Sequence, residues 1–405
     1  MSPTGSTFPD AMELALKNPA TVRRTAASIA SLALAATLAS PVLAHAQDND
    51  AEASSASDVV AGSSRSPLSG GSSIDVALSS VDAIGSSEFP VPEDLVEVND
   101  AYPRPFGESY DKPAIADIEK EDRPGVDRWF VESPAMARTV ELQVLPAADP
   151  DEPSPILFLL DGLSAPRNSG WVSHADLEGA FVGDNVTVVM PTEARGSMFV
   201  DWHNDDPGLG RNKWESLIAT ELPPLLAEEV PNHNGKFGVG GLSMGASGAV
   251  ALANANPEVF DAVFGISGCY STTSPAGRMM AHGTVESRGG DSANLYGPDS
   301  SGLRERYDVV NRPEGLRDME VYLSATTGAV SAGDEEHYGD DALGMALGVI
   351  LEQGANSCTR DLDAAMGRAG MDHQEVVFLD EGAHDWAMFA AQLAPAWEHI
   401  KDGLY

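Results

Sequence analysis

The sequence predicts an α/β protein whose core is an open, mostly parallel sheet with helices on both faces. From residue 138 onward, short apolar runs typical of strands alternate with longer stretches that have helical periodicity. Two of the runs, 155–160 and 185–191, are almost continuously apolar, as in strands that are buried on both faces of a parallel sheet. No segment recurs with a period of about 20–50 residues, which excludes solenoid folds.

The strands follow from their residue patterns, taken in chain order. Residues 138–145 alternate polar and apolar side chains, which indicates a strand with one buried face. The runs 155–160 and 185–191 are the two buried strands, and the first of them ends in Asp161-Gly162. Further strands are predicted over 236–240, 262–267, 320–324 and 375–379.

Helices are predicted between these strands. Residues 214–228 place aliphatic side chains along one side of a helix. Residues 246–255 are a run of small side chains that stops before Pro257. The segments from 342 to 350 and beyond, and from 386 to 402, complete the alternation. Ligands of such sheets bind beyond the carboxyl ends of the strands, so the functional residues are expected in the loops there.

The charge composition narrows the possible functions. The 405 residues include 24 Lys and Arg against 62 Asp and Glu, a formal net charge of -38. Such a surface repels phosphate backbones, which excludes nucleic-acid binding, and it disfavours docking on anionic lipid. The two cysteines are too few for a disulfide-rich scaffold or a four-cysteine zinc site. Beyond position 46 no apolar run is long enough to span a membrane.

The N-terminal part of the chain is predicted to lie outside the folded domain. Arg23 and Arg24 precede an uncharged apolar stretch that ends in Ala44-His45-Ala46, so residues 1–46 are predicted to be a secretory signal peptide cleaved after Ala46. Residues 47–92, rich in Ser, Ala, Gly and Asp, are predicted to be a disordered linker. Residues 93–125 are expected to form a poorly ordered lead-in, and residues 126–405 the catalytic domain.

A candidate nucleophile lies between the strand 236–240 and the helix 246–255. Gly241-Leu242-Ser243-Met244-Gly245 matches the G-x-S-x-G pattern, and its position between strand and helix is what a nucleophile elbow requires. The glycines allow a tight, strained turn that raises the Ser243 hydroxyl above the sheet. The same turn aims the backbone N–H of Met244 at the reaction centre.

A nucleophilic serine needs a base, and the base needs an orienting acid. His384 comes directly after the last predicted strand, where the catalytic histidine of this architecture belongs. The acid is expected after the strand 320–324, but several carboxylates lie there and spacing alone does not choose among them. They are Asp334, Glu335, Glu336, Asp340, Asp341 and Glu352.

Eight short motifs resemble, in order, the secreted mycolyltransferases, the antigen 85-type α/β-hydrolases. They are SPAMAR (133–138), LLDGL (159–163), GW (170–171), SMFVDW (197–202), KWE (213–215), TELP (220–223), GLSM (241–244) and HDW (384–386). The resemblance covers about 130–400 and implies an α/β-hydrolase fold.

The resemblance also implies roles for single residues. It selects Glu352 as the acid, whereas sequence spacing alone would favour Asp334 as the alternative. It also implies that the backbone N–H groups of Leu163 and Met244 form the oxyanion hole. The residues that it implies for sugar binding are Asp161 and Trp386, with Arg167 as the candidate to replace an arginine that the family has where this chain has Ser164.

The implied activity is transfer of a mycoloyl chain from trehalose monomycolate to a second trehalose monomycolate or to cell-wall arabinogalactan. The expected partners are therefore a mycoloyl-trehalose donor and a sugar acceptor. Neither a metal nor an organic cofactor is expected, and the chain is expected to act as a secreted monomer in the cell envelope. Two alternatives stay open: a secreted carboxylesterase that gives the acyl group to water, and a catalytically inert wall-binding protein.

The two cysteines are predicted to form a disulfide. Cys269 follows the strand 262–267, and Cys358 lies six residues beyond Glu352, so both are expected near the same end of the sheet. Thiols left over in an exported protein tend to pair. The alternative is two separate buried thiols.

Overall fold

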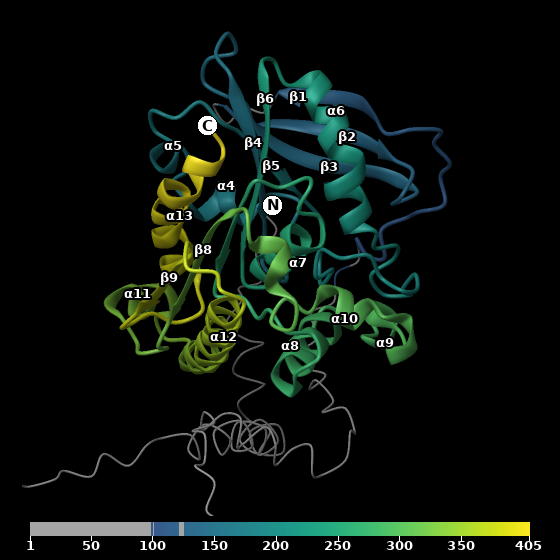
Figure 1. The fold of residues 1–405 in the computed structure, drawn as a ribbon. Helices are drawn as coiled ribbons and strands as arrows, with labels where there is room; N and C mark the ends of the chain where they lie inside the picture. The colour runs from purple at the N-terminus through teal and green to yellow at the C-terminus, as the bar shows by residue number, and fades with distance from the viewer. Residues whose placement is uncertain (1–98, 100, 121–124) are drawn as a thin grey trace, which may run out of the picture. The chain divides into compact units, whose positions relative to one another are not determined.

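The computed structural model describes residues 99, 101–120 and 125–405, and these contain one nine-stranded sheet (Figure 1). The order across the sheet is β1-β2-β3-β5-β4-β6-β7-β8-β9. The strands are β1 Ala114–Lys120, β2 Asp127–Ser133, β3 Arg138–Leu145, β4 Ser154–Leu160, β5 Thr187–Pro191, β6 His233–Leu242, β7 Ala262–Ile266, β8 Glu320–Thr326 and β9 Glu375–Leu379.

The sheet is antiparallel at one edge and parallel over the rest. Strands β1, β2, β3 and β5 pair antiparallel, whereas every pairing from β5 through β4 to β9 is parallel. The predicted mostly parallel sheet is therefore confirmed. In the parallel part, Leu160 at the end of β4 pairs with Gly241 of β6. This register brings the Asp161-Gly162 turn beside the predicted nucleophile.

Both faces of the sheet are buried, as the apolar run of β4 predicts. Ile156, Phe158 and Leu160 belong to one hydrophobic cluster, and Leu157 and Leu159 belong to another, all of them fully buried. The first cluster includes side chains of α6 Leu222–Glu229, α7 Met244–Ala255 and α12 Ala342–Arg368. The second includes α4 Gly170–His174, α5 Leu177–Ala180 and α13 Trp386–Ile400. Figure 1 shows α12 and α13 flanking β8 and β9.

Shorter helices fill the connections between the later strands. After β7 come α8 Pro275–Glu286, α9 Ala293–Tyr296 and α10 Leu303–Tyr307, with short 3-10 turns at Asp299–Ser301 and Pro313–Leu316. After β8 comes α11 Ala332–Tyr338, and a last 3-10 turn, Lys401–Gly403, follows α13. None of the described helices is long and apolar enough to cross a membrane.

Several details differ from the sequence prediction. The helix predicted over 214–228 is a π-helical turn, Ser216–Glu221, that continues into α6. Pro223 and Pro224 stand at the start of α6 and have no N–H to donate, which accounts for the change in hydrogen bonding there.

The lead-in 93–125 is the second difference, because it contains β1, which pairs with β2. The expectation of a poorly ordered segment is wrong for these residues. Most of β1 is exposed at the sheet edge, so it lacks the apolar pattern by which the strands from β3 onward were predicted. Its neighbour β2 was not predicted as a strand either. The signal peptide and linker predicted over 1–46 and 47–92 lie outside the described residues.

Candidate active site

Ser243 occupies a strained turn between β6 and α7. Its backbone has φ 53° and ψ -119°, a left-handed conformation that side chains rarely adopt. A Cβ added to Gly241 would lie 2.4 Å from the carbonyl carbon of Gly245, and one added to Gly245 would lie 2.2 Å from the Leu160 oxygen. Both flanking positions therefore require glycine, as the G-x-S-x-G pattern predicts.

The structure brings Ser243, His384 and Glu352 into one hydrogen-bonded chain. Ser243 Oγ lies 2.8 Å from His384 Nε2, and His384 Nδ1 lies 2.8 Å from Glu352 Oε2. His384 comes from the loop between β9 and α13, and Glu352 from α12, where it is fully buried. This arrangement can move a proton from the serine to the histidine while the carboxylate fixes the histidine tautomer.

Two residues that the sequence analysis missed position the Glu352 carboxylate. Oε1 of Glu352 accepts hydrogen bonds from the Thr326 backbone N–H and from the Ser267 hydroxyl, both 2.7 Å long. Ser267 has a φ of 56°, so its backbone also lies in the left-handed region. Both residues lie at carboxyl ends of parallel strands, and that position is the signal that could have identified them.

Asp334, the alternative acid, lies elsewhere in the same loop region. Its carboxylate accepts the backbone N–H of Ser331 at 2.6 Å and that of Ala383 at 3.0 Å. The first of these bonds completes a capping box at the start of α11. The structure thus places Glu352, and not Asp334, against His384 Nδ1.

The predicted oxyanion donors belong to two turns next to Ser243. Met244 follows Ser243 at the N-terminus of α7, where backbone N–H groups point out of the helix. Leu163 follows the turn beside the elbow, and a Cβ added to Gly162 would lie 3.7 Å from Ser243 Cβ. The carbonyl of Leu163 accepts the Gly196 N–H at 3.0 Å, which anchors this turn to the neighbouring loop.

Asp161 and Trp386 converge on Gly170 beside this turn. Asp161 Oδ1 accepts the Gly170 N–H at 3.0 Å, whereas Asp161 Oδ2 is buried without a hydrogen-bond donor in the described part of the chain. Burial raises the pKa of Asp161 to about 7, and the neighbouring Ser169 side chain and the Gly170 and Trp171 backbone N–H groups act in the opposite direction. The Trp386 ring packs so closely on Gly170 that a Cβ there would lie 2.1 Å from it, and its other neighbours include His174, stacked at 4.9 Å between ring centroids.

Arg167 is placed differently from Asp161 and Trp386. Its Nε forms an ion pair with Glu141 of β3 at 2.9 Å, and 61% of its side chain is exposed. Glu141 also pairs with Arg128 of β2. Arg167 therefore belongs to a charge cluster on the antiparallel part of the sheet.

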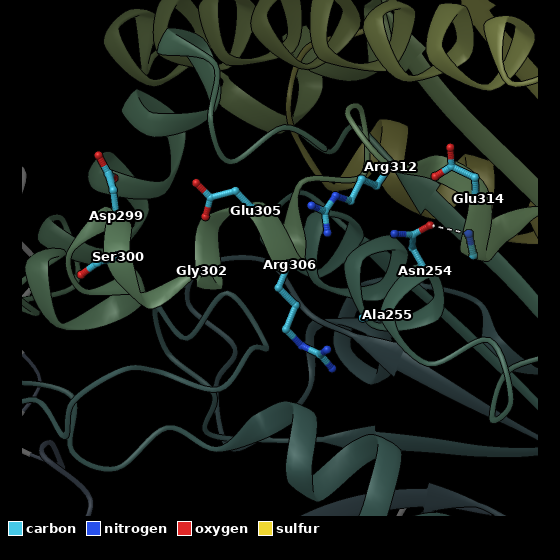
Figure 2. Close-up of a pocket in the computed structure, with 10 residues that line it drawn as sticks. Asn254, Ala255, Asp299, Ser300, Gly302, Glu305, Arg306, Arg312 and Glu314 are labelled. Carbon is cyan, nitrogen blue, oxygen red and sulfur yellow. Dashed lines mark hydrogen bonds between the residues drawn. The ribbon is translucent and has the colours of Figure 1, made fainter.

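Two cavities differ in their relation to Ser243. A narrow one of about 30 Å³ reaches Ser243 and is lined in part by Met198, Met280 and Cys269. A wider and more open one of about 600 Å³ lies near α10, and Figure 2 shows its charged lining. That lining, which includes Arg306, contains no residue of the predicted catalytic or sugar-binding set.

Cys269 and Cys358 are joined by a disulfide, with 4.8 Å between their Cα atoms. Cys269 borders the narrow cavity at Ser243, and its N–H bonds to Ser247 Oγ at 2.9 Å. Cys358 is on α12, the helix that carries Glu352. The disulfide therefore links the loop after β7 to the helix that supplies the acid.

Removal of this disulfide is expected to destabilise the protein. The bond closes a loop with a sequence separation of 89, for which chain entropy predicts a loss of about 4.6 kcal/mol in the free energy of unfolding. Denaturant unfolding of Cys269→Ala/Cys358→Ala measures the loss. As a control, reductant should destabilise the unmodified chain and leave the double variant unchanged. Two free thiols in the denatured, unreduced protein would contradict the expectation.

The fold and these contacts define an α/β-hydrolase with the serine elbow of the serine hydrolases. The chain belongs to the Esterase family, whose model matches residues 133–400. The diacylglycerol acyltransferase/mycolyltransferase Ag85A of Mycobacterium ulcerans is 27% identical over 282 residues, which are 67% of this chain and 80% of the relative. Ag85A of Mycobacterium tuberculosis (strain ATCC 25618 / H37Rv) is 28% identical over 283 residues, with the same coverage.

Solved structures agree on the fold. Mycobacterium tuberculosis MPT51 (FbpC1) superposes with a TM-score of 0.57 at 21% identity, covering 69% of this chain and 99% of that one. An S-formylglutathione hydrolase from Agrobacterium tumefaciens has a TM-score of 0.54 at 16% identity, covering 72% and 99%. The similarities in sequence and fold together support an acyl-transferring enzyme of the serine-hydrolase type.

Proposed function

We propose that the protein is a serine acyltransferase that moves a mycoloyl chain from trehalose monomycolate to a second sugar. The acceptor is another trehalose monomycolate or cell-wall arabinogalactan. The observation that carries the proposal is the chain of 2.8 Å hydrogen bonds from Ser243 through His384 to Glu352, beside a turn that holds Asp161. The similarity to the Ag85A mycolyltransferases supports the choice of substrate.

The reaction takes place in two acyl-transfer steps. His384 Nε2 accepts the Ser243 proton as Oγ attacks the ester carbonyl of the donor. The developing oxyanion accepts hydrogen bonds from the backbone N–H groups of Leu163 and Met244, each worth roughly 3 kcal/mol in comparable sites. The intermediate then collapses to an acyl-Ser243 ester, and His384 returns its proton to the departing trehalose oxygen.

The second step repeats the first with the acceptor in place of the serine. A sugar hydroxyl gives its proton to His384 and attacks the acyl-Ser243 carbonyl, and the proton returns to Ser243 as the new ester leaves. Glu352 stabilises the imidazolium in both steps. Every proton and acyl transfer is supplied by these side chains, so the scheme uses no metal or organic cofactor.

Asp161 and Trp386 are proposed to hold the sugar. Asp161 Oδ2 is a buried acceptor with no donor in the described part of the chain, which suits a sugar hydroxyl. The Trp386 indole supplies an apolar surface for a sugar ring beside it. Transfer exceeds hydrolysis only when this site holds the acceptor better than it admits water. The signal peptide predicted over 1–46 would deliver the enzyme to the cell envelope, where such substrates lie.

A donor–acceptor assay tests the proposal. Purified protein incubated with trehalose monomycolate should yield trehalose dimycolate and free trehalose. Release of the free acid without dimycolate would indicate the carboxylesterase instead. Failure of a fluorophosphonate to label Ser243 in the intact protein would favour the inert wall-binding protein.

Asp161→Asn is expected to shift the products toward hydrolysis. The one oxygen of the amide is needed to accept the Gly170 N–H, so its NH₂ group stands where Oδ2 was and cannot accept a sugar hydroxyl. A hydrogen bond to a charged group is worth about tenfold or more in binding. The ratio of dimycolate to free acid measures this shift.

The same variant is expected to be more stable than the unmodified chain above pH 7. Because the folded pKa of Asp161 is raised to about 7, its ionisation lowers stability as the pH rises from about 4 to about 7. The uncharged amide in the Asp161→Asn variant has no such cost. Thermal unfolding at acidic and alkaline pH measures the difference, and equal stability gaps at both would contradict the raised pKa.

A further inference from the structure

The connection that follows β5 is a loop buried along its whole length. Residues 192–199, the buried loop, are all buried, although loops normally run over the surface of a protein. Glu193, Met198 and Phe199 have φ values between 52° and 55°, in the left-handed region that side chains rarely adopt. Such strained backbone persists only where the surrounding contacts hold it, and it gathers at functional sites.

The buried loop contacts both residues that are proposed to donate to the oxyanion. The Gly196 N–H donates to the Leu163 carbonyl at 3.0 Å, and the Met198 N–H donates to the Met244 sulfur at 3.4 Å. The carbonyl and the N–H of Leu163 belong to one residue, so a shift of the buried loop would also change the direction of that N–H. The conformation of the loop therefore sets the geometry of the oxyanion hole.

A segment near the start of the described chain contacts the buried loop through two side chains. In residues 101–108, the N-terminal strap, only the side chains of Tyr102 and Arg104 are not exposed. Arg104 Nη2 forms an ion pair with Glu193 Oε2 at 2.9 Å. The Arg195 N–H donates to the Tyr102 hydroxyl at 3.4 Å, and the Arg195 guanidinium lies 5.8 Å from the centre of the Tyr102 ring.

The N-terminal strap is itself fixed to other parts of the domain. The N–H groups of Gly107 and Glu108 both donate to the Ala137 carbonyl, at 2.8 Å and 2.9 Å. The carbonyl of Arg104 packs on Gly210, where an added Cβ would lie 3.1 Å from it. These contacts do not involve the buried loop, so they hold the strap independently of it.

The two contacts of the strap differ in what their loss would do. Glu193 is 8% exposed, and a carboxylate buried to that degree needs a cationic partner, which Arg104 supplies. Without Arg104, the loop would move to bring this carboxylate into water. Arg195 is held a second time, because its Nε donates to the Arg288 carbonyl at 3.2 Å. Loss of Tyr102 would therefore loosen Arg195 without releasing it.

We propose that Tyr102 and Arg104 are positioning residues for the oxyanion hole, and that they act by holding the buried loop in its strained conformation. The inference rests on the proposed function, in which the N–H groups of Leu163 and Met244 stabilise the oxyanion. The hold of the strap on the loop does not depend on that function.

Four substitutions in the strap test the proposal. Tyr102→Ala removes the ring and the hydroxyl, whereas Tyr102→Phe keeps the ring beside the Arg195 guanidinium. Arg104→Ala removes the cation, whereas Arg104→Lys keeps a positive charge for Glu193. In each pair, the second variant should therefore behave nearly as the unmodified protein does.

Arg211→Ala is the matched control for Arg104→Ala. Arg211 forms an ion pair with Asp205 at 3.2 Å, and its side chain is 31% exposed, against 33% for Arg104. Its Nε donates to the Ala135 carbonyl at 2.7 Å, so its bonds hold other parts of the chain than the buried loop. The control should lose about as much thermal stability as Arg104→Ala and keep its turnover.

Turnover of p-nitrophenyl butyrate measures the positioning. Tyr102→Ala and Arg104→Ala should each lower kcat by about 10- to 100-fold, less than the loss of a whole oxyanion donor, with KM little changed. The acidic limb of the pH profile of kcat/KM should stay in place, because the contacts of His384 with Ser243 and Glu352 are unaltered. A loss no greater than that of Arg211→Ala, or a displaced acidic limb, overturns the positioning role.

Binding of phenylboronic acid gives a readout specific to the oxyanion hole. The boron forms a tetrahedral adduct with Ser243 Oγ, and one of its oxygens takes the place of the oxyanion. Its dissociation constant should rise in Tyr102→Ala and Arg104→Ala by about the factor by which kcat falls, and should not change in Arg211→Ala. A fall in kcat with unchanged affinity for the boronic acid overturns the proposal.

Hydrogen exchange decides whether the strap holds the buried loop, without any substrate. The amides of residues 193–199 should exchange about tenfold faster or more in Tyr102→Ala and Arg104→Ala than in the unmodified protein and in Arg211→Ala. Equal exchange in all four proteins overturns the inference. An unmodified protein that neither cleaves the ester nor binds the boronic acid would instead refute the proposed function, with hydrogen exchange still deciding the hold of the strap.

Discussion

Ser243→Ala and His384→Ala are each expected to lower kcat/KM by about 10⁵- to 10⁶-fold, and the double variant is expected to be scarcely worse than either. Ser243 Oγ and His384 Nε2 lie 2.8 Å apart and share one proton-transfer step, so loss of either abolishes the same step. Steady-state ester turnover by the three variants measures this. The oxyanion donors and substrate binding are retained, and they supply the residual rate.

Matched controls separate this effect from damage to the fold. Ser300→Ala and His373→Ala change exposed residues of the same types. Ser300 borders the larger cavity, and His373 lies just before β9, at the opposite end of that strand from His384. Both control variants should retain full turnover. The unfolding temperatures of all the variants should differ only slightly from that of the unmodified chain. Losses in the double variant that equal the product of the single losses would contradict a shared step.

The sequence predicted the parallel part of the fold because each strand there has an apolar run of its own. The run 155–160 is buried on both faces, and β4 is buried at every position. The antiparallel edge gave a weaker signal, since β1 is largely exposed and carries charged residues such as Asp117 and Lys120. The order of the strands is set by tertiary packing, and no local pattern indicates that β5 lies between β3 and β4.

In the candidate site, the sequence could predict the residues that lie within a few positions of a strand end, but not the residue that lies far from one. Ser243 and His384 come one and five residues after the ends of β6 and β9. The G-x-S-x-G motif after a strand therefore identified Ser243, and its position after the last strand identified His384. Glu352 is separated from β8 by α11 and ten residues of α12, and spacing could not distinguish it from Asp334. Only the resemblance to a family selected Glu352. The path of α11 and α12 depends on tertiary packing, which the local sequence does not reveal.

Glu352→Gln is expected to keep the fold and to lower kcat by roughly 10⁴-fold. The Thr326 N–H and the Ser267 hydroxyl both donate to Oε1, so the glutamine oxygen is held there and its NH₂ group faces His384 Nδ1. A donor at that position favours the histidine tautomer with its proton on Nε2. That tautomer cannot accept the Ser243 proton, so the loss should appear in kcat while KM changes little.

Two further variants distinguish the tautomer effect from general damage to the site. Ser267→Ala removes one donor from Glu352 but leaves its charge and its bond to His384, so we expect a loss of about tenfold, the value of one hydrogen bond. Asp334→Asn disturbs the segment before His384 without touching Nδ1, so its loss should stay well below that of Glu352→Gln. A larger loss from Asp334→Asn would assign the acid to Asp334, because the tautomer of His384 would then depend on that carboxylate.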